Sequence, residues 1–200
     1  MKRTLLAAML LSVALPSMAE SNAYASLLLG NTNQDESQLR SDGSFAFEDD
    51  DVSIGLRFGY HFGEYIAAEI GYIDYGQVES NITDAVTTDV INDRFDTYAI
   101  TIGAKFNFTI EQIGLSFNAR VGAAQWNYRD DFTRTVSAPL AQTTSDDGTD
   151  VYYGIGMEYD VSETVTIGVE YHQLNLEIEG AQGEFDHDIE NYSLSATRRF

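Results

Sequence analysis

The chain contains no cysteine, and proline occurs only at Pro16 and Pro139. Without cysteine no disulfide can brace the fold, so its stability must come from packing and hydrogen bonding alone. Beyond the N-terminal segment, no apolar run approaches the roughly 18 residues that a membrane-spanning helix requires. These absences exclude a disulfide-braced scaffold and a helical membrane protein.

Basic residues are also scarce. The 200 residues include 11 lysines and arginines against 32 aspartates and glutamates, which gives a formal net charge of −21. Such a surface repels nucleic acid, and it repels anionic lipid unless cations intervene. Nucleic acid is therefore excluded as a partner.

Residues 1–19 have the features of a secretory signal peptide. Two basic residues precede an apolar run over 5–15, and small residues at Ser17 and Ala19 mark the expected cleavage site. The run is too short to span a bilayer, which disfavours an uncleaved anchor. We therefore expect a mature chain of residues 20–200 that forms one domain. Loss of the two basic residues leaves 9 against 32 acidic residues, a net charge of −23.

Strict alternation of apolar and polar residues recurs along the chain. It is clearest over residues 52–62, where one face is apolar and the other is small or charged. A period of two indicates a β-strand, and an uninterrupted apolar face indicates that the strand meets lipid. Strands cross a bilayer only as a closed barrel, because an open edge would leave backbone groups unpaired in hydrocarbon. Such strands are predicted at residues 23–30, 52–62, 65–73, 98–108, 113–127, 151–159, 164–172 and 192–200.

The predicted connections alternate in length. Short turns lie around Gly63, around Glu111 and at residues 160–163. Long loops are predicted at residues 31–51, 74–97, 128–150 and 173–191. This alternation is typical of outer-membrane barrels, so the predicted fold is all-β, an eight-stranded antiparallel up-and-down transmembrane β-barrel. A soluble lipocalin-like barrel is the alternative, and it would place its large apolar residues inside.

Short motifs in these strands support a more specific assignment through their order and spacing. They are AEIGY at 68–72, GAK at 103–105, ARVG at 119–122, GMEY at 156–159, VEY at 169–171 and YSLSATRRF at 192–200. In these motifs the chain resembles the transmembrane domain of the outer membrane protein A family and its small eight-stranded relatives. The resemblance covers the whole mature chain and implies a location in the bacterial outer membrane, in contact with its lipid and lipopolysaccharide.

The resemblance also implies a role for the C-terminal segment. In that family, a terminal aromatic residue preceded by alternating apolar residues is the insertion signal that the barrel-assembly machinery reads. Tyr192, Leu194, Ala196 and Phe200 match this layout, whereas Arg198 stands where an apolar or aromatic residue is usual. An arginine near the membrane edge can snorkel to water, so this departure bears on insertion efficiency rather than on the fold.

The inward faces of the predicted strands hold three positive and three negative residues, namely Arg57, Lys105, Arg120, Glu69, Glu158 and Glu170. An unpaired charge in so narrow an interior is costly, so we predict a paired, hydrogen-bonded network. Eight strands leave an interior just wide enough for side chains, which argues against an open pore. An ion gate made of exchangeable pairs is the alternative. The resemblance implies such a gate, but Gly168 replaces its strand-seven arginine here.

Signals for catalysis are weak. A lipid-modifying enzyme needs a nucleophile or an acid–base group poised by a histidine. No nucleophile motif accompanies His61, His172 or His187. We interpret these histidines as polar loop residues, which Ser137 or Ser145 would approach only through loop folding. The sequence therefore predicts no enzyme and no cofactor.

Signals for metal binding are weak as well. Acidic runs at residues 48–51, 145–148 and 185–188 offer oxygen ligands, but none has the spacing of a calcium loop. A dedicated metal site is therefore not predicted.

The long predicted loops hold most of the acidic residues, 24 of the 32. We predict a non-enzymatic role in structural integrity or in surface interaction, such as adhesion to or recognition of a host or phage ligand. A narrow gated channel for small ions is the alternative, and a lipid-modifying enzyme is less favoured. Lipopolysaccharide is anionic too, so divalent cations would have to bridge it to this rim. A salty habitat is a second explanation of the acidity.

Overall fold

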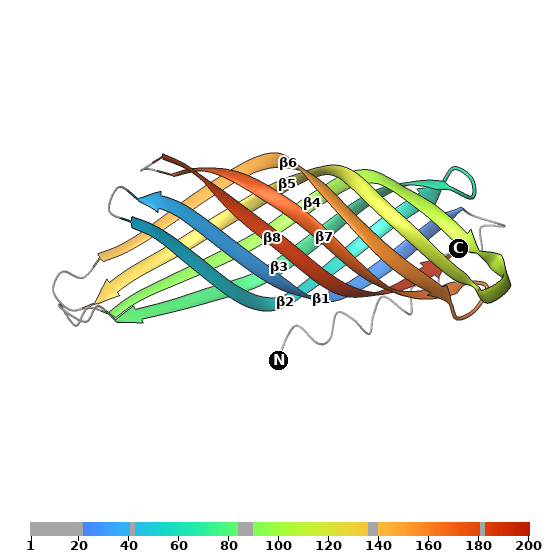
Figure 1. Cartoon of the computed structure of the whole chain (residues 1–200), viewed down its shortest axis with the longest axis horizontal. Coiled ribbons are helices and arrows are strands. Elements are labelled where there is room, and N and C mark those ends of the chain that lie inside the picture. Colours follow the sequence, from blue (N-terminus) through green and yellow to red (C-terminus); the bar gives the residue numbers. More distant parts are fainter. Residues whose placement is uncertain (1–21, 41–42, 84–89, 136–139, 181–182) are drawn as a thin grey trace.

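The computed structural model describes residues 22–40, 43–83, 90–135, 140–180 and 183–200. Eight antiparallel strands form one closed barrel in chain order, with β8 paired to β1 (Figure 1). They are β1 (Ala23–Arg40), β2 (Gly43–His61), β3 (Ile66–Thr83), β4 (Val90–Ile110), β5 (Leu115–Thr135), β6 (Leu140–Asp160), β7 (Val165–Gly180) and β8 (Gly183–Arg199). A short 3₁₀ turn, η1 (Glu111–Ile113), joins β4 to β5. The predicted fold class is confirmed. In the described part of the chain, no helix has the length and apolar character needed to cross a membrane.

The two ends of the barrel differ. One end carries the tight connections between β2 and β3, β4 and β5, and β6 and β7, and we call it the short-turn end. The other end carries long strand pairs, and we call it the extended end (Figure 1). The described termini meet at the short-turn end, where the N–H of Phe200 donates to the carbonyl of Ala23 at 3.0 Å. The predicted signal peptide, residues 1–19, lies outside the described residues, and its removal stays a prediction.

The strands continue far beyond their predicted ends, so the prediction of long loops is wrong. Residues 31–51 lie mostly in β1 and β2, whose ladder continues to the pair of Arg40 and Gly43. The same correction applies to residues 74–97, 128–150 and 173–191. Lipid imposes the alternation only where one face of a strand meets it. The pattern therefore fades at the membrane edge although the backbone ladder continues.

The outer wall of the membrane-spanning part is apolar. Ile102 is 64% exposed and Ile155 is 65% exposed, whereas the inward residues next to them, Thr101 and Gly154, are buried. Exposed tyrosines form a girdle toward the extended end, at Tyr72, Tyr98, Tyr153 and Tyr192. Apolar side chains outside and polar ones inside are the arrangement of a lipid-facing barrel, the reverse of a lipocalin.

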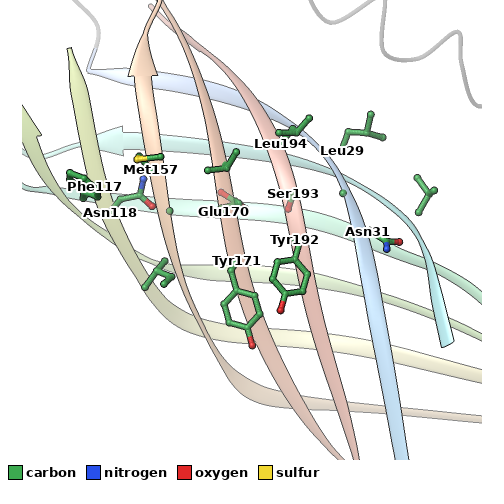
Figure 2. Close-up of a pocket in the computed structure, with 15 residues that line it drawn as sticks. Leu29, Asn31, Phe117, Asn118, Met157, Glu170, Tyr171, Tyr192, Ser193 and Leu194 are labelled. Atoms are coloured by element: carbon green, nitrogen blue, oxygen red, sulfur yellow. The ribbon is translucent and has the colours of Figure 1, made fainter. Parts of the chain in front are cut away.

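A shallow groove of about 950 Å³ crosses this outer wall (Figure 2). Its lining is almost entirely apolar and includes Leu29, Met157, Val169, Tyr171, Tyr192 and Leu194. The rings of Tyr171 in β7 and Tyr192 in β8 lie side by side, with centroids 4.9 Å apart. Because these side chains belong to the lipid-facing wall, we expect acyl chains to fill the groove in a bilayer.

Two of the strand ladders stop early. Pairing of β2 with β3 ends at Ile54 and Asp74, and pairing of β6 with β7 ends at Tyr152 and Leu174. The other ladders continue toward the extended end. The barrel therefore parts there into two four-stranded sheets, β7-β8-β1-β2 and β3-β4-β5-β6, which are seen at the left of Figure 1. Gly76, with φ +87°, lies at the bulge where β3 leaves β2.

Candidate functional site

The six predicted lumen charges meet in one buried layer. Each of the strands β2 to β7 contributes one of them, and each has a side chain no more than 11% exposed. Their positions follow from the alternation, since each occupies an inward place on a strand whose outward neighbours face lipid. We call this group the charge layer, namely Arg57, Glu69, Lys105, Arg120, Glu158 and Glu170.

Two ion pairs in the charge layer are doubly bonded. Arg57 donates from Nη1 and Nη2 to the two oxygens of Glu170, at 2.9 and 2.8 Å. Lys105 donates from Nζ to both oxygens of Glu158, at 2.7 and 2.8 Å. Bidentate, charge-assisted bonds of this kind are short and directional, so both pairs are held in fixed geometry.

Arg120 links the pairs into a network. Its Nε lies 3.0 Å from Glu69 Oε2, its Nη2 lies 3.1 Å from Glu158 Oε1, and its Nη1 lies 3.2 Å from Glu170 Oε2. Arg57 Nε adds a longer contact to Glu69, at 3.7 Å. Three positive and three negative charges thus balance. Balance and hydrogen bonding are what allow charges to remain inside a narrow lumen.

Two neutral residues complete the charge layer, and neither was predicted from the sequence as part of the network. The hydroxyl of Tyr24 in β1 donates to Glu69 Oε1 at 2.5 Å, and Arg120 Nη1 donates to Asn118 Oδ1 at 2.5 Å. Both lie at inward positions of alternating strands, which was the signal available for them. Gly59 makes room for the Tyr24 ring, since a Cβ at that position would collide with it.

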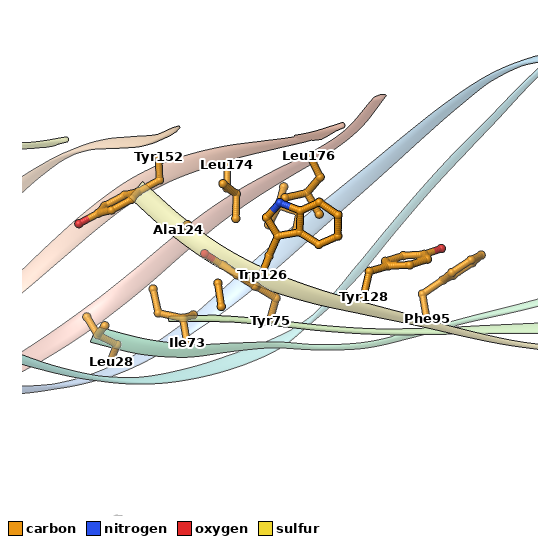
Figure 3. Packing of buried hydrophobic residues seen from close by; sticks show 12 residues of the cluster. Leu28, Ile73, Tyr75, Phe95, Ala124, Trp126, Tyr128, Tyr152, Leu174 and Leu176 are labelled. Carbon is orange, nitrogen blue, oxygen red and sulfur yellow. The ribbon is translucent and has the colours of Figure 1, made fainter. Parts of the chain in front are cut away.

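A second buried layer, made of apolar side chains, fills the lumen between the charge layer and the extended end. Figure 3 shows the packing of its residues. Trp126, Leu174 and Leu176 are each no more than 1% exposed and pack together between the two sheets. We call this group the apolar plug; it comprises Leu28, Ile73, Tyr75, Phe95, Ala99, Ala124, Trp126, Tyr128, Tyr152, Leu174, Leu176 and Ile189.

The apolar plug was not predicted from the sequence because the apolar residues change from the outer to the inner face along a strand. In β7 the apolar residues up to Tyr171 are outward, whereas Leu174 and Leu176 are inward. In β5 the outward Val121 gives way to the inward Trp126. Outside the membrane the outer face meets water, so apolar side chains are buried only on the inner face. The signal in the sequence was the change of the apolar residues from odd to even positions along one strand, as in β7.

Two histidines lie inside the barrel, so their interpretation as polar loop residues is wrong. His172 and His187 are each 3% exposed. The Nε2 of His172 lies 3.1 Å from the hydroxyl of Tyr75, and the Nε2 of His187 lies 3.1 Å from Gln34 Oε1. His187 lies beyond the tyrosine girdle, outside the membrane-spanning part of β8, and burial lowers its pKa to about 4.

Neither buried histidine hydrogen-bonds a serine in the described part of the chain. Ser145 is exposed on β6, and Ser137 lies outside the described residues. His61 is half-buried at the short-turn end, beside a polar pocket of about 460 Å³ that Lys105 and Glu158 also line.

Among the residues described by the structure, no three acidic or histidine side chains converge as metal ligands would. Most side chains of the candidate run 48–51, and half of those in the run 185–188, lie outside the described set. In the third run, 145–148, the Asp146 carboxylate instead accepts a bond from the N–H of Asp147 at 2.9 Å.

Three residues of the predicted insertion signal lie on the outer face of β8, and Phe200 follows the end of that strand. Tyr192 and Leu194 are 56% and 63% exposed, and Ala196 is exposed as well. Arg198 is exposed near the short-turn end, where water is within its reach. Reading of this segment by an assembly machinery stays a prediction.

Comparison with known proteins places the chain in a family. The model of the outer membrane protein β-barrel domain matches residues 4–200, so the chain belongs to that family and is an outer-membrane protein of bacteria. No curated protein matches the sequence significantly.

Solved structures with the same fold are small outer-membrane barrels. The attachment invasion locus protein Ail of Yersinia pestis, in complex with the heparin analogue sucrose octasulfate, is 18% identical with a TM-score of 0.54, over 90% of this chain and 99% of Ail. Neisserial surface protein A is 14% identical with a TM-score of 0.60, over 90% and 98%. The outer membrane protein OprG of Pseudomonas aeruginosa is 11% identical with a TM-score of 0.62, over 90% and 97%. At these identities the likeness shows the fold.

Proposed function

We propose that this chain is a non-enzymatic, non-conducting barrel that holds an acidic binding surface outside the outer membrane. The closed lumen carries this proposal. A solute entering from the short-turn end meets the charge layer and then the apolar plug, both of which are buried across the barrel. With the interior filled, the surface available to partners is the extended end. Short turns face the periplasm in this class of barrel, so the extended end faces the outside of the cell.

The sign of the charge at the extended end selects the class of partner. Of the described side chains there, the basic ones are Arg94 and Arg129, and the acidic ones are Asp51, Asp74, Asp96, Asp131, Asp146, Asp147, Asp150, Asp188 and Glu190. Arg94 and Arg129 lie beside Asp96 and Asp131, at 3.9 and 3.3 Å, so their charges are offset locally. A field of this sign attracts basic surfaces and repels polyanions.

The proposed partners are therefore basic patches on host or phage proteins. Ail binds a sulfated polyanion in its solved complex, and we expect this chain to reject such a ligand despite its similar fold. Contact with lipopolysaccharide through bridging divalent cations belongs to the same proposal, because the cations would offset two surfaces of like charge.

A narrow gated channel is the second candidate function. Arg120 favours it, because three carboxylates lie within 3.2 Å of its guanidinium and partners could be exchanged among them. Rearrangement of these pairs would open only the charge layer. The apolar plug would also have to move, and its residues are packed against one another with no more than 7% exposure.

Binding to barrels reconstituted in nanodiscs tests the proposed function. An oligolysine peptide, an oligoglutamate peptide and sucrose octasulfate serve as probes at low and high salt. We expect only oligolysine to bind, and its affinity to fall as the screening length shortens from about 10 Å at 0.1 M to about 3 Å at 1 M salt. Empty nanodiscs of the same lipid are the control. Binding of sucrose octasulfate, or no binding of oligolysine, would contradict the proposal.

A further inference from the structure

The parting of the barrel leaves strand edges without a neighbouring strand. Beyond Tyr152 the strand β6 pairs only with β5, and beyond Leu174 the strand β7 pairs only with β8, within the described residues. One side of β6 is therefore free over residues 140–151. A free edge presents backbone N–H and C=O groups that another extended chain can bind.

Hydrogen bonds at the short-turn end show which residues of β6 point to this free side. The N–H of Asp160 donates to Gly114 on the β5 side, and the N–H of Val161 donates to Val165 on the β7 side. Successive residues of a strand direct their backbone groups to opposite sides, and the β5–β6 register is continuous. The residues facing the free side are therefore the odd-numbered ones. They include Thr143, Ser145, Asp147 and Thr149, all with exposed side chains.

At the start of the other parting, between β2 and β3, carboxylates cap backbone donors of the two strands. Asp51 accepts bonds from the N–H groups of Val52 and Gln77, at 2.7 and 2.5 Å. Asp74 accepts a bond from the N–H of Gly76 at 3.0 Å. Capping of edge donors by side chains is one way in which proteins block unwanted strand pairing. The start of the β2–β3 parting is thus protected against an added strand.

The free edge of β6 is protected much less. Along its described residues, a side-chain carboxylate caps the N–H of Asp147 alone, through Asp146 at 2.9 Å. The N–H groups of Ser145 and Thr149, on either side of it, have no such cap. The edge strand is also hydrogen-bonded to the apolar plug, since Trp126 Nε1 donates to Asp150 Oδ2 at 2.6 Å. This edge therefore combines open backbone donors with a fixed position.

Charge indicates which extended chain suits the edge. Asp147 is exposed at its centre, and Asp146 and Asp150 flank it on the same strand. We propose that residues 145–149 of β6 bind an extended basic segment of a partner protein, which adds to the sheet as a further strand. This inference rests on the proposed function and specifies where it is carried out. Backbone bonds supply affinity in this mode of recognition, and side chains beside Asp147 supply selectivity.

Strand addition can be separated from simple charge attraction. The probe is a peptide of alternating lysine and valine, used both as such and with backbone N-methylation, which keeps the charge but removes the donors. The variants are Thr149→Pro, which removes an edge N–H, and Thr149→Ala, which keeps it as the matched control. Thr149 directs its backbone groups away from β5, so the proline leaves the β5–β6 ladder intact. Ser145→Pro is a second variant for use if Thr149→Pro does not fold.

We expect the unmethylated peptide to bind the wild type and Thr149→Ala alike in nanodiscs. Thr149→Pro should weaken its binding about fivefold because it removes one hydrogen-bond donor, and N-methylation, which removes several donors, should weaken binding at least as much. Equal binding to Thr149→Pro and wild type, with oligolysine still bound, would overturn strand addition at β6. The proposed function would remain. If no basic peptide binds, the proposed function fails and this inference fails with it. Cross-linked dimers that disappear in Thr149→Pro would assign the edge to a second copy of the chain instead.

Discussion

Arg120→Met is the substitution that tests the charge layer most sharply. Arg120 is the one residue of the layer that contacts all three glutamates. After its loss, Glu170 keeps its two bonds from Arg57, and Glu158 keeps its two bonds from Lys105. Glu69 keeps only the 3.7 Å contact to Arg57 and the hydroxyl of Tyr24. The layer would then hold two positive and three negative charges, with the excess charge on Glu69.

The expected cost follows from this imbalance. Removing one partner from a buried ion pair costs about 3–5 kcal/mol, because a charge is left without compensation. Adding Glu69→Gln should restore the balance, so the double variant should be about 1–3 kcal/mol more stable than Arg120→Met alone. Arg129→Met is the matched control. Its side chain is 59% exposed beside Asp131, and pairs of this kind contribute less than about 1 kcal/mol.

Urea unfolding in lipid vesicles measures these differences. Trp126 is the chain's single tryptophan and lies in the apolar plug, so its fluorescence reports loss of the packed lumen. Unheated gel mobility gives an independent measure of barrel closure. If Arg120→Met costs no more than Arg129→Met, the charge layer is not a balanced network. The same conclusion holds if Glu69→Gln makes Arg120→Met still less stable.

Three further predictions follow from the outer wall, the buried histidine and the apolar plug. Ile102→Lys should lower the free energy of unfolding in vesicles by about 2–4 kcal/mol because it places a charge among acyl chains. Thr149→Lys, on the outer face but beyond the girdle, should lower it little. Equal losses would contradict the assignment of the membrane-spanning part. Because burial lowers the pKa of His187 from 6.5 to about 4, its contribution to stability is present above pH 6.5 and is lost as the pH falls toward 4. His187→Gln should therefore flatten this part of the stability profile, and parallel profiles would rule the effect out. Trp126→Ala should cost about 3–5 kcal/mol by opening a cavity, as measured by gel mobility in urea, and a cost below about 1 kcal/mol would show that the plug is loosely packed.

Much of the membrane-spanning barrel was predictable from the sequence because two solvents act on each strand. Lipid requires apolar residues outside, and the narrow lumen requires balanced charges inside, so the alternation around Arg57 or Glu170 fixes both faces. Beyond the girdle neither requirement holds. Leu174 and Leu176 turn inward there, and the two sheets pack on each other through contacts between distant strands. A parity switch signals the change of face, but it does not say which strands meet or that the β2–β3 and β6–β7 ladders end.

Planar-bilayer recording of the refolded protein shows whether the lumen is closed. With the charge layer and the apolar plug both in place, we expect no current steps above the lipid baseline at either polarity of the applied voltage. Reproducible single-channel steps from heat-modifiable, correctly folded protein would contradict this expectation, and would assign the exchangeable contacts of Arg120 to a gate.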